Sequence, residues 1–199
     1  MSTSLLANLM GVLIAVVITF PPSVTSHGRM LMPPSRMSAW RFPGLPGRWN
    51  PNDHIQWCGD LNQENQTRHE GLKVNDGTCG VCGDRWDRVP RKYELPDGYY
   101  MKGVELVNTP YTQGQTIDIQ IQLTQSHWGY FEFRLCNRDS LGGEEATHAC
   151  LDENLLELEN GLTRFQIPVA GTAEDYIIKA KLPDELTCEK CLLQWKYNT

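Results

Sequence analysis

The sequence predicts an all-β fold, an antiparallel sandwich with long loops stapled by disulfides. Hydrophobic residues alternate with polar ones over short segments, which is typical of half-buried strands, and such segments recur along the second half of the chain. The 17 glycines and 12 prolines suit turns between short strands better than a helical bundle. With 199 residues, the chain can bury one ordinary hydrophobic core.

The alternation is clearest at 117–123, where isoleucine or leucine occupies every second position and aspartate or glutamine lies between. Residues 27–91 show little clean periodicity and are expected to form long loops with short helical turns. Leu151, Leu155 and Leu158 would share one face of a short helix, although their pattern leaves the assignment ambiguous. We expect strands at 104–107, 117–123, 130–135, 165–169, 176–182 and 193–197.

The first 26 residues are predicted to be a secretory signal peptide. They carry no charged side chain, Leu5–Phe20 is mostly apolar, and Val24-Thr25-Ser26 places small residues before a cleavage site. A membrane anchor is the alternative, but the apolar run is shorter than the roughly 20 residues that a span needs. Cleavage after Ser26 would leave a secreted, extracellular domain at 27–199.

The net charge of the chain indicates which kinds of partner it can bind. Lys plus Arg is 18 and Asp plus Glu is 24, which gives a formal net charge of −6. Affinity for phosphates needs clustered Lys and Arg, so we expect no nucleic-acid partner. We also expect no association of the mature domain with a membrane.

An oxidising compartment predicts disulfides among the seven cysteines. The CxxC pairs at 79–82 and 188–191 would also suit zinc, but their wide separation and the expected secretion favour disulfides. Cys136 and Cys150 flank a glycine-rich connection and are expected to bridge, whereas Cys58 is expected to pair with Cys79 or Cys82. The odd number leaves at least one cysteine over.

A glycosylation sequon at Asn65-Gln66-Thr67 fits the same secretory route. Asn65 is the expected glycosylation site.

His27 becomes chemically special if the signal peptide is removed. Its free amine and its imidazole can chelate one metal ion, and a third nitrogen from another histidine would complete a planar, T-shaped set that suits Cu(II). His127 is the expected third ligand, because it lies on a loop between the strands predicted at 117–123 and 130–135. The remaining histidines are expected to be solvated: His54, His69 and His148.

Several motifs then carry a family resemblance: HGRM at 27–30, PPSR at 33–36, CGVCGD at 79–84, HWGYFEFRLC at 127–136 and LQWKY at 193–197. Together they resemble the lytic polysaccharide monooxygenases, most closely the animal branch, auxiliary activity family fifteen, also described as a chitin-binding type-4 domain. The resemblance implies an immunoglobulin-like sandwich with one copper ion, held by the amine and ring of His27 and the ring of His127. These two residues are thus the expected catalytic and metal-binding residues.

The resemblance also implies a function. The family oxidises glycosidic C–H bonds in insoluble chitin or cellulose, with an external electron donor and O2 or H2O2. A non-catalytic chitin-binding module and a secreted copper-binding protein are the alternatives. Trp128 and Trp57 are candidates for stacking on sugar rings, with core packing favoured for Trp57. Glu132 and Arg134 are expected to form a cross-strand ion pair on a solvated face rather than to serve the copper site.

The relatives continue past the position of Tyr197 with a loop, further cysteines and a last strand that supplies an aromatic residue axial to the copper. This chain stops at Thr199. We therefore expect a sandwich without its last strand or the axial aromatic, and a Tyr197 that lies in the core or at its edge. The odd cysteine count agrees with a lost segment.

Overall fold

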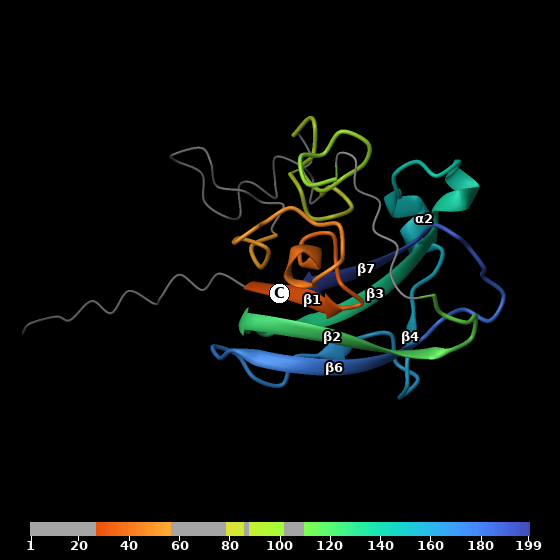
Figure 1. Cartoon of the computed structure of the whole chain (residues 1–199). Helices are drawn as coiled ribbons and strands as arrows, with labels where there is room; N and C mark the ends of the chain where they lie inside the picture. The colour runs from red at the N-terminus through yellow and green to blue at the C-terminus, as the bar shows by residue number, and fades with distance from the viewer. Residues whose placement is uncertain (1–26, 57–78, 86–87, 102–109) are drawn as a thin grey trace, which may run out of the picture.

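Two antiparallel sheets pack face to face in this computed structural model, which describes residues 27–56, 79–85, 88–101 and 110–199 (Figure 1). One sheet has the strand order β1-β2-β6-β4 and the other β5-β3-β7. The strands are β1 (His27–Met32), β2 (Thr116–Gln125), β3 (Tyr130–Asn137), β4 (Glu157–Leu158), β5 (Phe165–Gln166), β6 (Glu174–Lys181) and β7 (Cys191–Asn198). The short helices are η1 (Ala39–Arg41), η2 (Arg138–Leu141) and α2 (His148–Asp152).

The predicted sandwich is confirmed. β2 pairs with β6 and β3 pairs with β7 along almost their whole lengths. The strand expected at 165–169 is shorter than predicted, because Pro168 cannot donate to a sheet ladder. The strand expected at 104–107 lies outside the described residues.

The expectation of loops throughout 27–91 is wrong at its start, where β1 pairs with β2. The register of β1 shifts near both of its ends, between residues 27 and 28 and between residues 30 and 32, which interrupts the period of two. The neighbouring residues Arg29 and Met30 are both buried, whereas a regular strand would bury only one of them. Alternation therefore could not reveal the strand. The ambiguous leucines divide between elements: Leu151 belongs to α2 and Leu158 to β4.

The main core lies between the sheets. Ile119, Ile121 and Leu123 of β2 are almost fully buried, as are Phe131 and Phe133 of β3. Each fully buried side chain of this kind contributes about 1.5–3 kcal/mol relative to exposure. The core thus makes β2 and β3 a rigid support for the loop that joins them.

A smaller core cluster surrounds the predicted bridge between Cys136 and Cys150, which is present with a Cα–Cα distance of 5.2 Å. Cys188 and Cys191 are also bridged, and Cys79 is disulfide-bonded. Cys82 is free, and burial raises the pKa of its thiol to about 12. The pairing expected for Cys58 lies outside the described residues.

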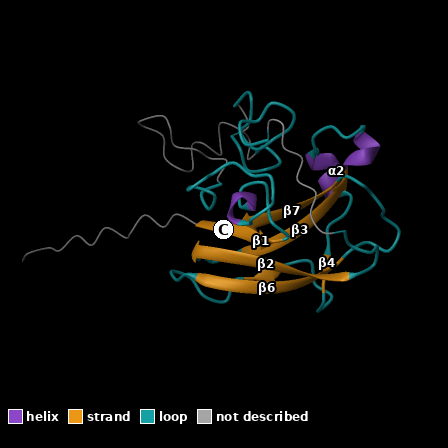
Figure 2. Cartoon of the chain, viewed as in Figure 1, coloured by secondary structure: helices purple, strands orange, loops and turns teal. Residues whose placement is uncertain are grey.

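Long loops gather over the β1 side of the sandwich, as the teal segments of Figure 2 show. Buried charged contacts hold them together. Arg36 and Glu145 form a two-pronged ion pair, with Nη1 2.6 Å from Oε2. Within the described residues, no helix is long and apolar enough to cross a membrane.

Candidate metal centre

His27 is the first residue of β1 and lies opposite Gln125, the last residue of β2. The carbonyl oxygen of His27 accepts a hydrogen bond from Oγ1 of Thr124 at 3.3 Å. The amide of Gly28 donates to the carbonyl oxygen of His54 at 3.0 Å. The backbone around His27 is thus held by β2 on one side and by a loop on the other.

His127 lies in the loop between β2 and β3, and this loop is fixed on both sides. The hydroxyl of Tyr197 accepts a hydrogen bond from the His127 amide at 2.7 Å and donates one to the His127 carbonyl at 2.7 Å. Ser126 is fully buried and exchanges backbone hydrogen bonds with Gly171 and Thr172. Gly129 has a φ of 125°, and a Cβ at this position would collide with the carbonyl of Asn198.

The sheet register brings the two predicted ligands to the same end of the molecule. His27 is paired with Gln125, and His127 follows Gln125 after one intervening residue. Figure 1 shows the start of β1 and the arrowhead of β2 side by side at this end. The Nε2 atom of His127 is buried and has no hydrogen-bond partner among the described residues.

His54 does not match the expectation of a solvated histidine. Its ring lies against the His27 ring, with centroids 5.3 Å apart and planes tilted by 49°. Its side chain is 25% exposed, and its Nδ1 is buried with no hydrogen-bond partner in the described part of the chain. Burial and the positive charge of Arg29 lower the pKa of His54. Sequence reasoning missed this contact because no periodic pattern places residue 54.

The other two histidines expected to be solvated differ from His54. His148 is exposed as expected, although its Nε2 lies 2.7 Å from the carbonyl oxygen of Cys79. His69 lies outside the described residues. No contact among the described residues joins His148 to His27.

A buried carboxylate adjoins His54. The Asp53 side chain is fully buried, with Oδ1 3.0 Å from Nε of Arg29 and Oδ2 bonded to Nε of Arg41. Oδ2 also accepts from Nε1 of Trp40 at 3.2 Å. These contacts fasten the loop of residues 53 and 54 to β1 and η1, because a buried charge is costly to separate from its partners.

These residues fit a copper ion bound by nitrogen donors. Leaving the buried Nε2 of His127 without a partner costs free energy, and a metal ion would satisfy it. No described group of three or more His, Cys, Asp or Glu side chains gathers for a metal. The proposed copper site would not form such a group, because it consists of two histidine side chains and one backbone amine.

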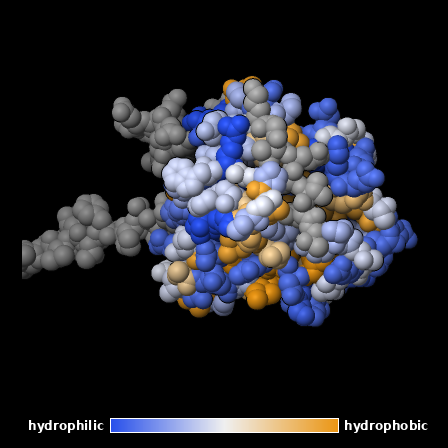
Figure 3. All heavy atoms as spheres, viewed as in Figure 1, coloured by the Kyte–Doolittle hydropathy of each residue, from blue (hydrophilic) through white to orange (hydrophobic). Residues whose placement is uncertain are grey.

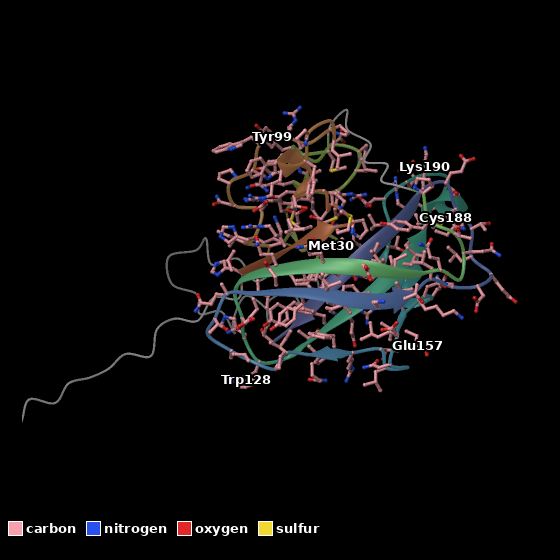
Figure 4. The ribbon with its side chains drawn as sticks, turned by 60° about the horizontal axis from the view of Figure 1, so that its bottom comes forward. Met30, Tyr99, Trp128, Glu157, Cys188 and Lys190 are labelled. Atoms are coloured by element: carbon pink, nitrogen blue, oxygen red, sulfur yellow. A yellow bond between two sulfur atoms is a disulfide. The ribbon has the colours of Figure 1, made fainter. Side chains whose placement is uncertain are left out.

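Trp128 adjoins His127 and is 67% exposed. Figure 4 shows it at the opposite end of the sandwich from Cys188 and Lys190. Trp49 is also exposed, at 71%, and its ring lies edge-on against Trp40. Sequence reasoning did not single out Trp49. The predicted residues Trp57 and Asn65 lie outside the described part of the chain.

Glu132 and Arg134 form the expected ion pair at 2.9 Å, and Arg164 binds the same carboxylate at 3.0 Å. Burial works against ionisation of Glu132, but hydrogen bonds from Arg164 and Arg134 hold its pKa below the ordinary value. The face is less solvated than expected, because Glu132 is only 5% exposed. The Glu132 carboxylate is thus already bound by two arginines and is not needed as a metal ligand.

A cavity of about 420 Å³ lies at the other end of the sandwich, beside Asn137 and Thr187. It is remote from His127 and takes no part in the centre described here. The surface in Figure 3 is largely hydrophilic, with hydrophobic side chains showing in its lower half. Ile177 of β6 is 70% exposed.

Comparison with known proteins gives two matches. The family described as "lytic polysaccharide mono-oxygenase, cellulose-degrading" matches residues 27–199. Among solved structures, the chain is similar to a lytic polysaccharide monooxygenase of family AA15 from Thermobia domestica in the Cu(I) state. The two are 37% identical with a TM-score of 0.70, over 87% of this chain and 83% of that chain. No curated protein matches the chain.

Proposed function

This chain belongs to the lytic polysaccharide monooxygenases, of the animal AA15 type, and from that premise we propose that His27 and His127 hold the copper ion of its active site. The family activity is copper-dependent oxidative cleavage of polysaccharides. The observation that carries the assignment is the shared position of these residues at one end of β1 and β2. The buried Nε2 of His127, which has no hydrogen-bond partner among the described residues, supports it.

The donor set depends on removal of residues 1–26. Cleavage after Ser26 would give His27 a free amine, which has an ordinary pKa of about 8 and loses its proton readily to a metal. The amine and ring of His27 would then supply two nitrogens, and the ring of His127 a third. When bound, copper supplies the redox chemistry that oxidises a sugar C–H bond, with an external electron donor and O2 or H2O2.

The rest of the centre serves to hold these donors still. Tyr197 fixes the backbone of His127, and the pairing of β1 with β2 fixes the backbone of His27. Because the two strands belong to one sheet, the donors share a rigid support. Neither donor therefore depends on an unsupported loop.

Insoluble chitin or cellulose is the proposed substrate, and the protein is proposed to meet it outside the cell. A crystalline polymer cannot enter a deep pocket, so binding needs exposed side chains on an open surface. Trp128 is exposed beside His127 and offers a ring face for stacking on a sugar. Trp57 is a further proposed contact.

The test is release of oxidised oligosaccharides from crystalline chitin and from cellulose. The copper-loaded secreted protein is incubated with ascorbate and O2, and the products are analysed by mass spectrometry. Oxidised products that disappear in His127→Ala support the proposal. Binding to chitin without turnover would instead indicate a non-catalytic module, and copper binding without polymer affinity would indicate a copper-binding protein.

A further inference from the structure

We propose that His54 is a positioning residue, which holds the imidazole of His27 in the orientation that copper binding requires. This inference rests on the proposed copper site at His27 and His127. It replaces the sequence-based expectation that His54 is merely solvated. It concerns the ring of His54 and the packing of that ring, not its protonation.

His27 needs such support more than His127 does. In the proposed mature protein it is the first residue, and chain ends are poorly ordered unless they are tied down. Its ring turns about two side-chain bonds, whereas closing a chelate with the amine fixes both. Immobilising a side chain on binding costs conformational entropy, and a ring already held in place avoids much of that cost.

The contact with His54 can supply this order. The centroid separation of 5.3 Å and the tilt of 49° lie within the range of packed aromatic pairs. The same residue also accepts the backbone hydrogen bond of Gly28, at 3.0 Å. His54 therefore touches the ring of His27 and binds the peptide group that follows it.

His54 is itself held in place. Its neighbour Asp53 is fully buried and is bound by Arg29 from β1 and by Arg41 from η1. Arg29 lies two positions after His27 on the same strand. The ion pairs therefore tie the loop that carries His54 to the strand that carries His27.

A direct role as a further copper ligand is the competing explanation. It would use the buried Nδ1 of His54, which lies 3.7 Å from Oδ1 of Asp53 and has no hydrogen-bond partner in the described ranges. However, the described residues gather no group of three metal-binding side chains. Packing between the rings of His54 and His27 is therefore favoured.

The experiment compares three substitutions of His54 in the secreted protein. His54→Ala and His54→Gln remove the ring, whereas His54→Phe keeps a ring of similar shape without nitrogen. Copper(II) affinity is measured by calorimetry, and the copper environment by electron paramagnetic resonance. In the metal-free protein, nuclear relaxation reports the mobility of the His27 ring. Thermal unfolding shows which variants fold.

We expect His54→Ala and His54→Gln to lower copper affinity about tenfold, as is typical for loss of an outer partner of a metal ligand. Both should alter the resonance spectrum and increase the mobility of the His27 ring. His54→Phe should restore all three properties. His148→Ala is the matched control and should behave as the wild type, because the His148 side chain is exposed and its ring forms a hydrogen bond with the backbone carbonyl of Cys79.

Two results would overturn the role of His54 while leaving the proposed copper site intact. If wild-type protein binds copper through His127 and the ring-less variants behave identically to it, His54 positions nothing. If His54→Phe is as impaired as His54→Ala, a nitrogen of His54 is required and the packing explanation is wrong. If wild-type protein binds no copper, or His127→Ala leaves its affinity unchanged, the proposed site fails and the inference fails with it.

Discussion

The hydroxyl of Tyr197 lies 2.7 Å from both the backbone nitrogen and the carbonyl oxygen of His127. One phenol therefore satisfies both backbone groups of a proposed copper ligand. Tyr197→Phe should lower the free energy of unfolding by about 1–3 kcal/mol, because it leaves these groups unpaired. It should also lower copper affinity about tenfold by loosening the loop. Urea denaturation and calorimetric titration with copper measure the two effects.

Tyr176→Phe is the matched control. Both tyrosine rings pack edge-on against Phe131, at centroid distances of 4.8 Å for Tyr197 and 6.0 Å for Tyr176. The hydroxyl of Tyr176 is buried without a hydrogen-bond partner among the described residues. Its removal should change neither stability nor copper affinity appreciably. Equal losses in the two variants would mean that the hydrogen bonds to His127 are unimportant.

A second prediction concerns the N-terminus. The secreted protein should begin at His27, because Val24-Thr25-Ser26 forms a cleavage pattern and the proposed copper site requires a free amine there. Intact-mass analysis and N-terminal sequencing of protein from the culture medium measure this directly. Any other N-terminus would remove the chelating amine from the site.

The strands were predictable where one face is buried. Ile119 and Ile121 alternate with polar residues, because β2 presents one side to the core and the other to solvent. β1 was not predictable in this way, since its register shifts and its buried Arg29 hide the period. A strand whose buried positions include a charged residue in an ion pair has the hydropathy pattern of a loop.

The site was only partly predictable for a similar reason. His127 was expected on a loop at the rim because regular strands flank it on both sides. The contact of His54 with His27 depends on buried ion pairs between distant segments, which sequence spacing does not encode. The two hydrogen bonds between the Tyr197 hydroxyl and the His127 backbone likewise arise from the pairing of β3 with β7. Tertiary contacts of this kind leave no local pattern.

A third prediction is that the Arg36–Glu145 pair stabilises the fold in a pH-dependent way. The side chains are 9% and 14% exposed. Burial raises the pKa of Glu145, but the bonds from Arg36 outweigh it and hold that pKa below its ordinary value. A carboxyl whose pKa is lowered by folding adds stability above its unfolded pKa of about 4.3, and this stability is lost as the pH falls through the folded pKa.

Glu145→Gln should therefore lower the free energy of unfolding by about 3 kcal/mol at pH 7, because it leaves Arg36 without its ion-pair partner. The difference from the wild type should shrink in acid. Denaturant titrations of metal-free protein at pH 7 and pH 3 measure it. Glu159→Gln is the control, because its pair with Lys179 is exposed and 3.7 Å long, and it should cost less than about 1 kcal/mol. A difference that is equal at both pH values would contradict the assignment.

The last prediction concerns His127→Ala. Loss of its ring should lower copper affinity by more than about a hundredfold, beyond the usual effect of losing an outer partner of a ligand. It should also abolish oxidation of polysaccharide. Stability should change by less than about 1 kcal/mol, because the variant removes a buried nitrogen that has no described partner, while Tyr197 still binds the backbone. Copper titration, product analysis and urea denaturation separate these effects. His148→Ala should match the wild type in all three, and undiminished copper affinity in His127→Ala would show that the metal is bound elsewhere.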